Sequence, residues 1–497
     1  MKIFYSSCFL LSFTILSACK TQDTTTIQFS PTDEYRNCRQ SNTNSFAHVL
    51  PCYVQTLAKQ PLNYRFDSNE QLSAHLSLKR YTLYSQQWSP NDQVSPSDWQ
   101  HQVDMYIPDQ AQHRTALLVI NNGTRKTENL PRINPNDFDP ETLAKIAEQT
   151  QSIVISVSDI PNQPLLYAGQ DKAVREDESV AQSWKFFMQN PAQYELLPLH
   201  IPMVASVSQA IGLAQKELSS YGIKKFIITG ASKRAWTAWL TALSNPDVEA
   251  IVPFVFDLLN TQKGLSHMYY SYGQNWPIAF APYYQADIDH QIENSNFTQF
   301  MQIEDPLQYM YPTHTNQTNI TTYIINASGD DFYVPDNSRF YFNDLSTDKT
   351  LRVAPNSDHH GILNFTESSL IPFLNRYQNY KASPNIEEFI SNQNLSLKFS
   401  ETPIKIVQWT ALNPEARDFR LACGIRYSST PLKIQNNTLD IPLITPNQGW
   451  QATFIEATYA DGFIGTSQVY ITPDIYPNKA PSIQTGACQT RVGRGLK

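Results

Sequence analysis

The feature that most constrains the fold of this 497-residue chain is an alternation of apolar runs with helical stretches between about residues 116 and 377. Continuous apolar runs indicate strands buried on both faces, and such strands form parallel sheets when helices separate them. Parallel sheets of this kind bind ligands at the carboxyl ends of their strands. The sequence therefore predicts an α/β domain with a mostly parallel sheet. Its expected strands are 116–120, 153–157, 225–229, 250–256, 321–326 and 350–353.

Two further regions complete the predicted organisation. Residues 258–318 separate two of the expected strands and are dense in Tyr, Trp and Phe. A long aromatic insertion is typical of a lid over the functional edge of the sheet or of a satellite core, and the two interpretations are compatible. After about residue 390, short alternating runs broken by Pro, Asn and Gly predict a small β-sandwich-like domain. We thus expect an α/β domain over 46–385 and a β domain over 390–497.

The sharpest local signal follows the third expected strand, where residues 230–234 read Gly-Ala-Ser-Lys-Arg. Hydrolases place a serine on such a small-residue turn because it holds the hydroxyl above the sheet, beside a helix N-terminus. Ser232 would be the nucleophile, and the backbone N–H of Lys233 would donate to the oxyanion. An ordinary helix N-cap serine is the alternative. The second glycine of the usual pattern is missing, with Ala235 one place further along.

Two later loops offer a base and an orienting acid in the chain order that this kind of site requires. The fifth expected strand leads to Asp330 and Asp331, and the sixth leads to His359 and His360. Each pair alone is also compatible with a solvated loop. The shared order of the three groups favours a Ser-His-Asp triad at one edge of the sheet.

Together these residues resemble a known family, the PhoPQ-activated pathogenicity-related proteins. The resemblance implies an α/β-hydrolase-like domain followed by a small β domain, and it covers nearly all of the chain after the N-terminal segment. It favours Asp330 over Asp331 and His359 over His360, whereas Ala235 stands where the family usually has glycine. The matching segments are residues 160–164, 175–178 with Trp184, 230–236, 257–260, 329–330 with 335–336, 355–359, and Trp409 with 413–420.

Other matching residues have structural explanations. Asp257 ends a strand and is an alternative orienting acid, because the acid of such folds can move between strands. The acidic residues 176–178 open a helix, where its dipole favours negative charge. Arg417 and Asp418 are expected to form an ion pair that joins the two domains.

The N-terminus resembles a bacterial lipoprotein signal. Lys2 precedes an apolar run, residues 3–16, that is too short to span a membrane but suits a signal peptide. The run ends in Leu-Ser-Ala-Cys at residues 16–19, the pattern cut by lipoprotein signal peptidase, so Cys19 would carry the lipid. An ordinary signal peptide with an incidental cysteine is the alternative. We expect a signal over 1–18, a polar tether over 19–45 with order beginning near Phe46, and an outer-membrane location.

Four cysteines remain if Cys8 leaves with the signal and Cys19 is lipidated. An even number in an oxidising compartment predicts disulfides. Proximity in sequence favours Cys38–Cys52 and Cys423–Cys488. A zinc site is the rival interpretation, and no C-x-x-C spacing supports it.

Composition narrows the function. With 37 Lys+Arg against 45 Asp+Glu and no basic block, nucleic acid is not an expected partner. The 10 histidines form no H-x-x-x-H pair, so we expect no metal and no cofactor. The first hypothesis is a lipid-anchored serine hydrolase of the cell envelope that acts on an ester or amide of a small molecule or peptide. The second is a binding or signalling protein that keeps the fold without turnover.

Overall fold

The computed structural model describes residues 33–40, 45–111, 113–127, 131–310, 320–345, 348–434 and 436–496. The predicted signal peptide and Cys19 lie outside these residues. Within the described ranges, no helix has both the length and the apolar character needed to cross a bilayer.

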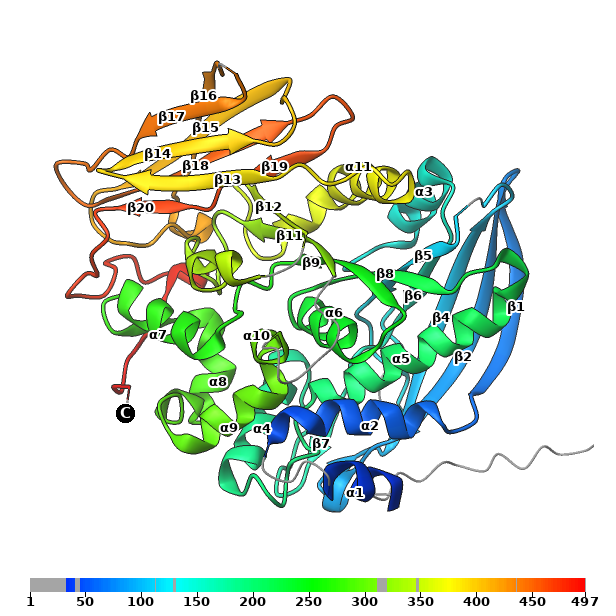
Figure 1. Cartoon of the computed structure of the whole chain (residues 1–497). Coiled ribbons are helices and arrows are strands. Elements are labelled where there is room, and N and C mark those ends of the chain that lie inside the picture. Colours follow the sequence, from blue (N-terminus) through cyan, green and yellow to red (C-terminus); the bar gives the residue numbers. More distant parts are fainter. Residues whose placement is uncertain are drawn as a thin grey trace, which may run out of the picture.

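A central sheet of nine strands forms the body of the molecule (Figure 1). Three strands at one edge of the sheet are antiparallel, and the six strands beyond them are parallel to one another. This mostly parallel arrangement is the predicted α/β-hydrolase fold. In spatial order the strands are β1 (Asn63–Ser73), β2 (Leu76–Gln87), β4 (Asp98–Pro108), β6 (Val154–Val157), β5 (Thr115–Ile120), β8 (Lys225–Ala231), β9 (Val248–Phe254), β11 (Thr321–Ala327) and β12 (Lys349–Ala354).

Burial along the sheet follows from position. All four residues of β6 are buried, as expected for a central strand of apolar residues covered on both faces. The edge strand β1 is polar and mostly exposed, which protects an open edge from pairing with other chains. The chemistry of each strand thus matches its place in the sheet.

Helices cover both faces because side chains of a strand alternate between them. Residues of α3 (Pro140–Thr150) and α11 (Thr366–Gln378) share one apolar core with Leu117 and Ile227. Residues of α2 (Val49–Ala58), α5 (His200–Glu217) and α6 (Lys233–Ser244) share the other with Leu118 and Ile228. The sheet is therefore the middle of three layers, and the ends of its strands remain open for a site.

The predicted insertion folds into short helices beside α4 (Glu176–Gln189) (Figure 1). Its rings pack face to face: Phe280 stacks on Trp276 at 4.3 Å and on Tyr283 at 5.2 Å between ring centroids. An aromatic satellite core is therefore present. The elements of the insertion are α7 (Thr261–Ser271), β10 (Asn275–Pro277), α8 (Ala281–Gln285), α9 (Ser295–Glu304) and α10 (Pro306–Tyr309).

Two antiparallel sheets form the C-terminal domain. The first has the order β13 (Ile386–Ser391), β14 (Asn394–Phe399), β17 (Thr438–Pro442). The second contains β16 (Ser428–Leu432), β15 (Lys405–Asn413), β18 (Trp450–Thr458) and β19 (Ile464–Thr466), with β20 (Tyr470–Thr472) also paired to β18. The tail returns to the α/β domain, where β21 (Thr490–Val492) pairs with β10 of the insertion.

The ordered body begins earlier than the predicted tether allowed. Residues 33–40 form helix α1 (Asp33–Gln40), and Tyr35 is buried. A disulfide between Cys38 and Cys52 fastens α1 to α2, which explains why this polar segment packs on the domain. The second predicted disulfide, Cys423–Cys488, is also present.

Candidate active site

Ser232 lies on the sharp turn between β8 and α6, as the sequence predicted. Its backbone has φ 57° and ψ −124°, a strained conformation that is usual for the nucleophile of this fold. The Ser232 N–H donates to the Phe254 carbonyl of β9 at 2.9 Å, which fixes the turn against the sheet. A Cβ on Gly230 would come within 2.8 Å of the Arg234 backbone, so the turn requires glycine there.

Lys233 follows as the first residue of α6. The first N–H groups of a helix have no partner inside it, so the Lys233 N–H is available as an oxyanion donor. The fifth position of the turn, which is glycine in the usual pattern, holds Arg234. Ala235, next to it in α6, is fully buried.

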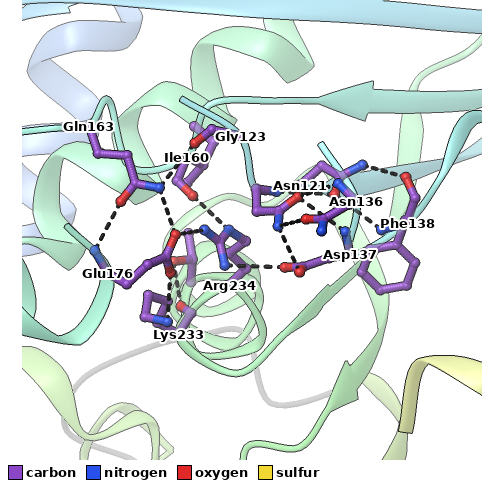
Figure 2. A network of polar contacts seen from close by, with 12 residues as sticks. Asn121, Gly123, Asn136, Asp137, Phe138, Ile160, Gln163, Glu176, Lys233 and Arg234 are labelled. Atoms are coloured by element: carbon purple, nitrogen blue, oxygen red, sulfur yellow. Dashed lines mark hydrogen bonds and ion pairs between the residues drawn. The ribbon is translucent and has the colours of Figure 1, made fainter. Parts of the chain in front are cut away.

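Arg234 and Lys233 enter a polar network behind the turn (Figure 2). The Arg234 Nε donates to the Ile160 carbonyl at 2.7 Å. One carboxylate joins the two cations, because Glu176 lies 2.7 Å from Arg234 Nη2 and 2.8 Å from Lys233 Nζ. Asp137 adds a second contact to Arg234 at 3.2 Å. The charges therefore hold the two residues after the serine in one orientation.

The sequence suggested only the helix dipole as an explanation for Glu176, but this residue also has several direct partners. Its N–H donates to Gln163 Oε1 at 2.9 Å, and Gln163 Nε2 donates to the Gly123 carbonyl at 3.0 Å (Figure 2). Burial raises the pKa of Glu176, but Arg234 and Lys233 outweigh it and hold that pKa well below the ordinary value. The sequence analysis did not predict that Glu176 holds Lys233 and Arg234. The family segments that contain Gln163 and Glu176 could have indicated such a role.

The predicted base and the predicted acid meet at the ends of β12 and β11. His359 Nδ1 lies 2.9 Å from Asp330 Oδ2 and 3.0 Å from Oδ1. The N–H groups of Phe332 and Tyr333 donate to the same Asp330 carboxylate, at 2.7 and 3.0 Å, and keep it turned toward the imidazole. Burial lowers the pKa of His359, but the Asp330 charge and hydrogen bond outweigh it, and the pKa is raised overall.

The alternative candidates, Asp257, Asp331 and His360, make different contacts. The Asp257 carboxylate accepts the Tyr341 hydroxyl at 2.5 Å, and burial raises its pKa to about 8. Asp331 and His360 border the same cavity as His359, but the carboxylate that touches His359 is that of Asp330. The geometry thus selects Asp330 over Asp257 as the partner of the imidazole.

Ser232 and His359 open onto one cavity of about 350 Å³. The predicted insertion supplies much of its wall, so these residues both form a satellite core and enclose the site. Among the described residues of the loop after β5, 121–127 and 131–139, none borders this cavity, although that loop carries the second oxyanion donor in related folds. The bordering residues of the insertion are Leu258, Leu265, Ala279, Phe280 and Tyr283.

The C-terminal domain supports the loop that carries Asp330. The Leu421 N–H donates to the Gly329 carbonyl at 3.0 Å, and a Cβ on Gly329 would lie 2.8 Å from the Leu421 nitrogen. Arg417 Nη2 binds Asp336 at 2.5 Å, with both side chains buried. The predicted pair of Arg417 with Asp418 is therefore wrong.

Asp418 pairs instead with Arg420, at 2.7 Å between Oδ2 and Nη2. The physical reason is local, since the Asp418 carboxylate also accepts the Arg420 backbone N–H two residues on, as aspartates in turns commonly do. Of the residues described, the one grouping with metal-ligand spacing is Asp418, Cys423 and Cys488, and its two sulfurs are joined in a disulfide.

The chain is similar to a known protein over most of its length and aligns with several solved structures. Autocrine proliferation repressor protein A of Dictyostelium discoideum is 26% identical over 431 residues, which cover 80% of this chain and 85% of that protein. Among solved structures, an acetyl xylan esterase from Paenibacillus sp. R4 aligns with TM-score 0.44 and 12% identity over 69% of this chain and 99% of the other. Acetyl xylan esterase 1 from Thermoanaerobacterium aligns with TM-score 0.42 and 11% identity over 68% and 95%.

A model of one protein family matches residues 50–420, which contain the serine turn, both loops of the acid and the base, and the insertion. The match ends at Arg420, within the segment of the β domain that supports Gly329 and Asp336. The chain belongs to the family of PhoPQ-activated pathogenicity-related proteins.

Proposed function

We propose that this protein is a serine hydrolase that cleaves an ester or an amide bond. The observation that carries the proposal is the joint geometry of Ser232 on a strained turn and His359 held by Asp330, with both Ser232 and His359 bordering one cavity. A surface serine and a surface histidine do not need these supports. An activated nucleophile does, because it requires a base in reach and a group that orients the base.

The proposed reaction follows from the residues. His359 takes the proton of the Ser232 hydroxyl as its oxygen attacks the substrate carbonyl. Asp330 keeps the imidazole oriented and stabilises its charged form, and the Lys233 N–H donates to the oxyanion. Collapse of the tetrahedral intermediate expels the alcohol or amine, which receives the proton from His359. Water then attacks the acyl-enzyme by the same route and releases the acid.

A fluorophosphonate probe tests this proposal directly, because covalent capture requires an activated serine. We expect wild type to be labelled and Ser232→Ala to be unlabelled. Ser244→Ala, at the other end of α6, is the matched control and should be labelled normally. The rate of ester hydrolysis should fall nearly as much in His359→Gln as in Ser232→Ala, and less in Asp330→Asn. The double variant Ser232→Ala with His359→Gln should be little slower than Ser232→Ala, since members of a triad act as a unit.

Two outcomes would contradict the hydrolase proposal. Labelling that survives Ser232→Ala would place the reactive serine elsewhere. A well-folded wild type that resists labelling would favour the second function, a binding or signalling protein with a hydrolase fold. The name of the relative from Dictyostelium discoideum, a repressor of proliferation, names an effect on cells and no bond that is cleaved, which is the observation in favour of that second function.

We further propose that the protein is a lipoprotein of the bacterial cell envelope, anchored through Cys19. A diacylated and N-acylated cysteine carries more than the single chain that gives only marginal membrane binding. Cys19→Ser should move the protein from the membrane to the soluble fraction, whereas Cys8→Ser, within the proposed signal, should not. An unchanged membrane fraction in Cys19→Ser would remove the anchor from the proposal.

A further inference from the structure

The cavity beside Ser232 has an unusual combination of walls. Six aromatic side chains border it, together with two carboxylates, Asp177 and Asp331. Aromatic faces carry negative charge density and attract cations. The six rings are those of Trp184, Trp236, Phe280, Tyr283, Phe332 and Tyr333.

The positive charge near the cavity is already matched. Lys233 is the one permanently charged cation among the bordering residues that the structure describes, and its Nζ lies 2.8 Å from Glu176 and 3.4 Å from Asp177. Arg234, directly behind it, is bound by Glu176 and Asp137 (Figure 2). Two cations thus face three carboxylates before any residue on the histidine side is counted. An anionic group of a substrate would find no cation left to receive it.

Asp331 adds a negative charge without a matching partner. Its Oδ1 is buried and has no hydrogen-bond partner among the residues that the structure describes. The groups that act on it are Asp330 and Asp358, which repel its charge, and His359 and Arg420, which attract it, while Arg420 is itself bound to Asp418. Burial, followed by Asp330 and Asp358, raises the pKa of Asp331 to about 6. An incoming cation would relieve this repulsion.

We propose that the cavity receives a positively charged ammonium group of the substrate, enclosed by the aromatic rings and paired with Asp331. The inference rests on the proposed hydrolase function for its place in the reaction, and it names the class of substrate. Asp331 then selects substrates, whereas Asp330 orients the base. Two adjacent aspartates at the end of β11 have different tasks.

Binding can be tested without turnover. Choline and 3,3-dimethyl-1-butanol have the same shape and differ in charge, and the bordering Trp184 and Trp236 offer a fluorescence signal. We expect wild type to bind choline at least about tenfold more tightly than the neutral alcohol, a difference of about 1.4 kcal/mol. Asp331→Asn should lower this ratio several-fold, leaving the smaller preference that the aromatic rings provide. Glu293→Gln removes the same charge from an exposed position that does not border the cavity, and should leave the ratio unchanged.

Turnover provides the second arm. The p-nitrophenyl esters of 4-(trimethylammonio)butanoate and 5,5-dimethylhexanoate are isosteric, so their ratio of kcat/KM isolates the charge. We expect the ratio to favour the cationic ester, to rise as the pH rises through about 6 where Asp331 ionises, and to fall in Asp331→Asn through KM.

The possible outcomes separate the two proposals. Equal binding of choline and the neutral alcohol, or a neutral ester that is preferred in wild type, would overturn the cationic substrate while Ser232-dependent hydrolysis still supports the proposed function. Selective choline binding that depends on Asp331, in a protein that neither reacts with fluorophosphonate nor cleaves esters, would support the cation site and overturn the hydrolase.

Discussion

The two sides of the candidate active site are supported by different parts of the molecule. On the serine side, Glu176 and Arg234 belong to the same α/β domain as Ser232 and hold its turn from behind (Figure 2). On the acid side, Gly329 and Asp336 are held by Leu421 and Arg417 of the C-terminal domain. The turn of Ser232 is thus stabilised within one domain, and the loop of Asp330 by contact between two.

This difference gives the C-terminal domain a role in the site. None of the described residues of the β domain, 390–434 and 436–496, borders the cavity that contains Ser232, yet this domain buries the guanidinium of Arg417 against the segment that follows Asp330. Damage to the contact between the domains should therefore impair the acid and the base and leave the serine turn intact. The two sides can be separated by experiment.

The largest effect is expected for Arg417→Met. Burial alone would raise the pKa of Asp336, but Arg417 and His267 hold that pKa far below its ordinary value, so the carboxylate stays charged. Loss of Arg417 leaves a buried charge with one fewer partner, which costs about 3–5 kcal/mol of the free energy of unfolding. Urea unfolding of wild type and Arg417→Met at neutral pH measures this difference in the free energy of unfolding.

The wild-type advantage should shrink in acid. Because the folded pKa of Asp336 is depressed, its contribution is present above the pKa of the unfolded chain and is lost as the pH falls toward the folded value. Lys433→Met, at an exposed cation of the same domain, is the control. If Arg417→Met were as stable as this control, the domain contact would not be the support described above.

Glu176→Gln should have the next largest effect, on the serine side. Lys233 and Arg234 would each lose their shared carboxylate, and we expect a cost of about 1–3 kcal/mol because the Glu176 side chain is 36% exposed. Fluorophosphonate labelling should slow, since the two residues after Ser232 lose the ion pairs that hold them in place. Glu178→Gln, an exposed acid of the same helical turn, should match wild type in both measurements. Equal effects of the two substitutions would contradict the role of the network.

A pair of glycines sharpens the comparison further. Gly230→Ala and Gly329→Ala each place a Cβ 2.8 Å from a backbone atom, of Arg234 in the same turn and of Leu421 in the other domain. Overpacking of this kind costs about 1–3 kcal/mol. We expect Gly230→Ala to abolish labelling, because its clash is inside the turn, and Gly329→Ala to slow labelling by displacing Asp330. Gly212→Ala meets only a leucine side chain at 3.5 Å and should be harmless.

The turn of Ser232 and the order of the three candidate residues could be read from the sequence because they depend on local signals. A strand followed by a small-residue turn and a helix specifies its own geometry, and parallel strands bring successive loops to the same edge. That reasoning located Ser232, His359 and Asp330, and the structure places the last two in contact.

The supports of the acid could not be predicted in the same way. The pair of Arg417 with Asp336 joins residues 81 positions apart in different domains, and its formation depends on how the domains pack. The sequence shows Arg417 beside Asp418, and nothing in that adjacency reveals that Asp418 instead turns to the backbone of Arg420. Periodicity specifies elements and their order, but contacts between domains are set by shape.

The smallest expected effect concerns the pH at which the site becomes active, and the charge with the largest influence on it, Asp330, lies on the acid side. His359 acts as a base only when it is neutral, so labelling should fall as the pH falls through the pKa of His359. Burial lowers this pKa, and the Asp330 charge and hydrogen bond raise it above the ordinary histidine value. The midpoint of wild type should therefore lie above that of an unperturbed histidine.

Asp330→Asn removes the group that favours the charged imidazole, so the midpoint of the remaining activity should move to lower pH while the maximal rate falls. Glu176→Gln should lower the rate and move the midpoint less than Asp330→Asn does, because the largest charge effect on the pKa of His359 comes from Asp330, and Glu176 is only an ion-pair partner of Lys233, which lowers that pKa. The midpoint of Arg417→Met should lie between those of the other two variants, since this substitution displaces the Asp330 loop without removing the carboxylate. An unchanged midpoint in Asp330→Asn would mean that another acid orients the imidazole, and the division between the two sides would have to be redrawn.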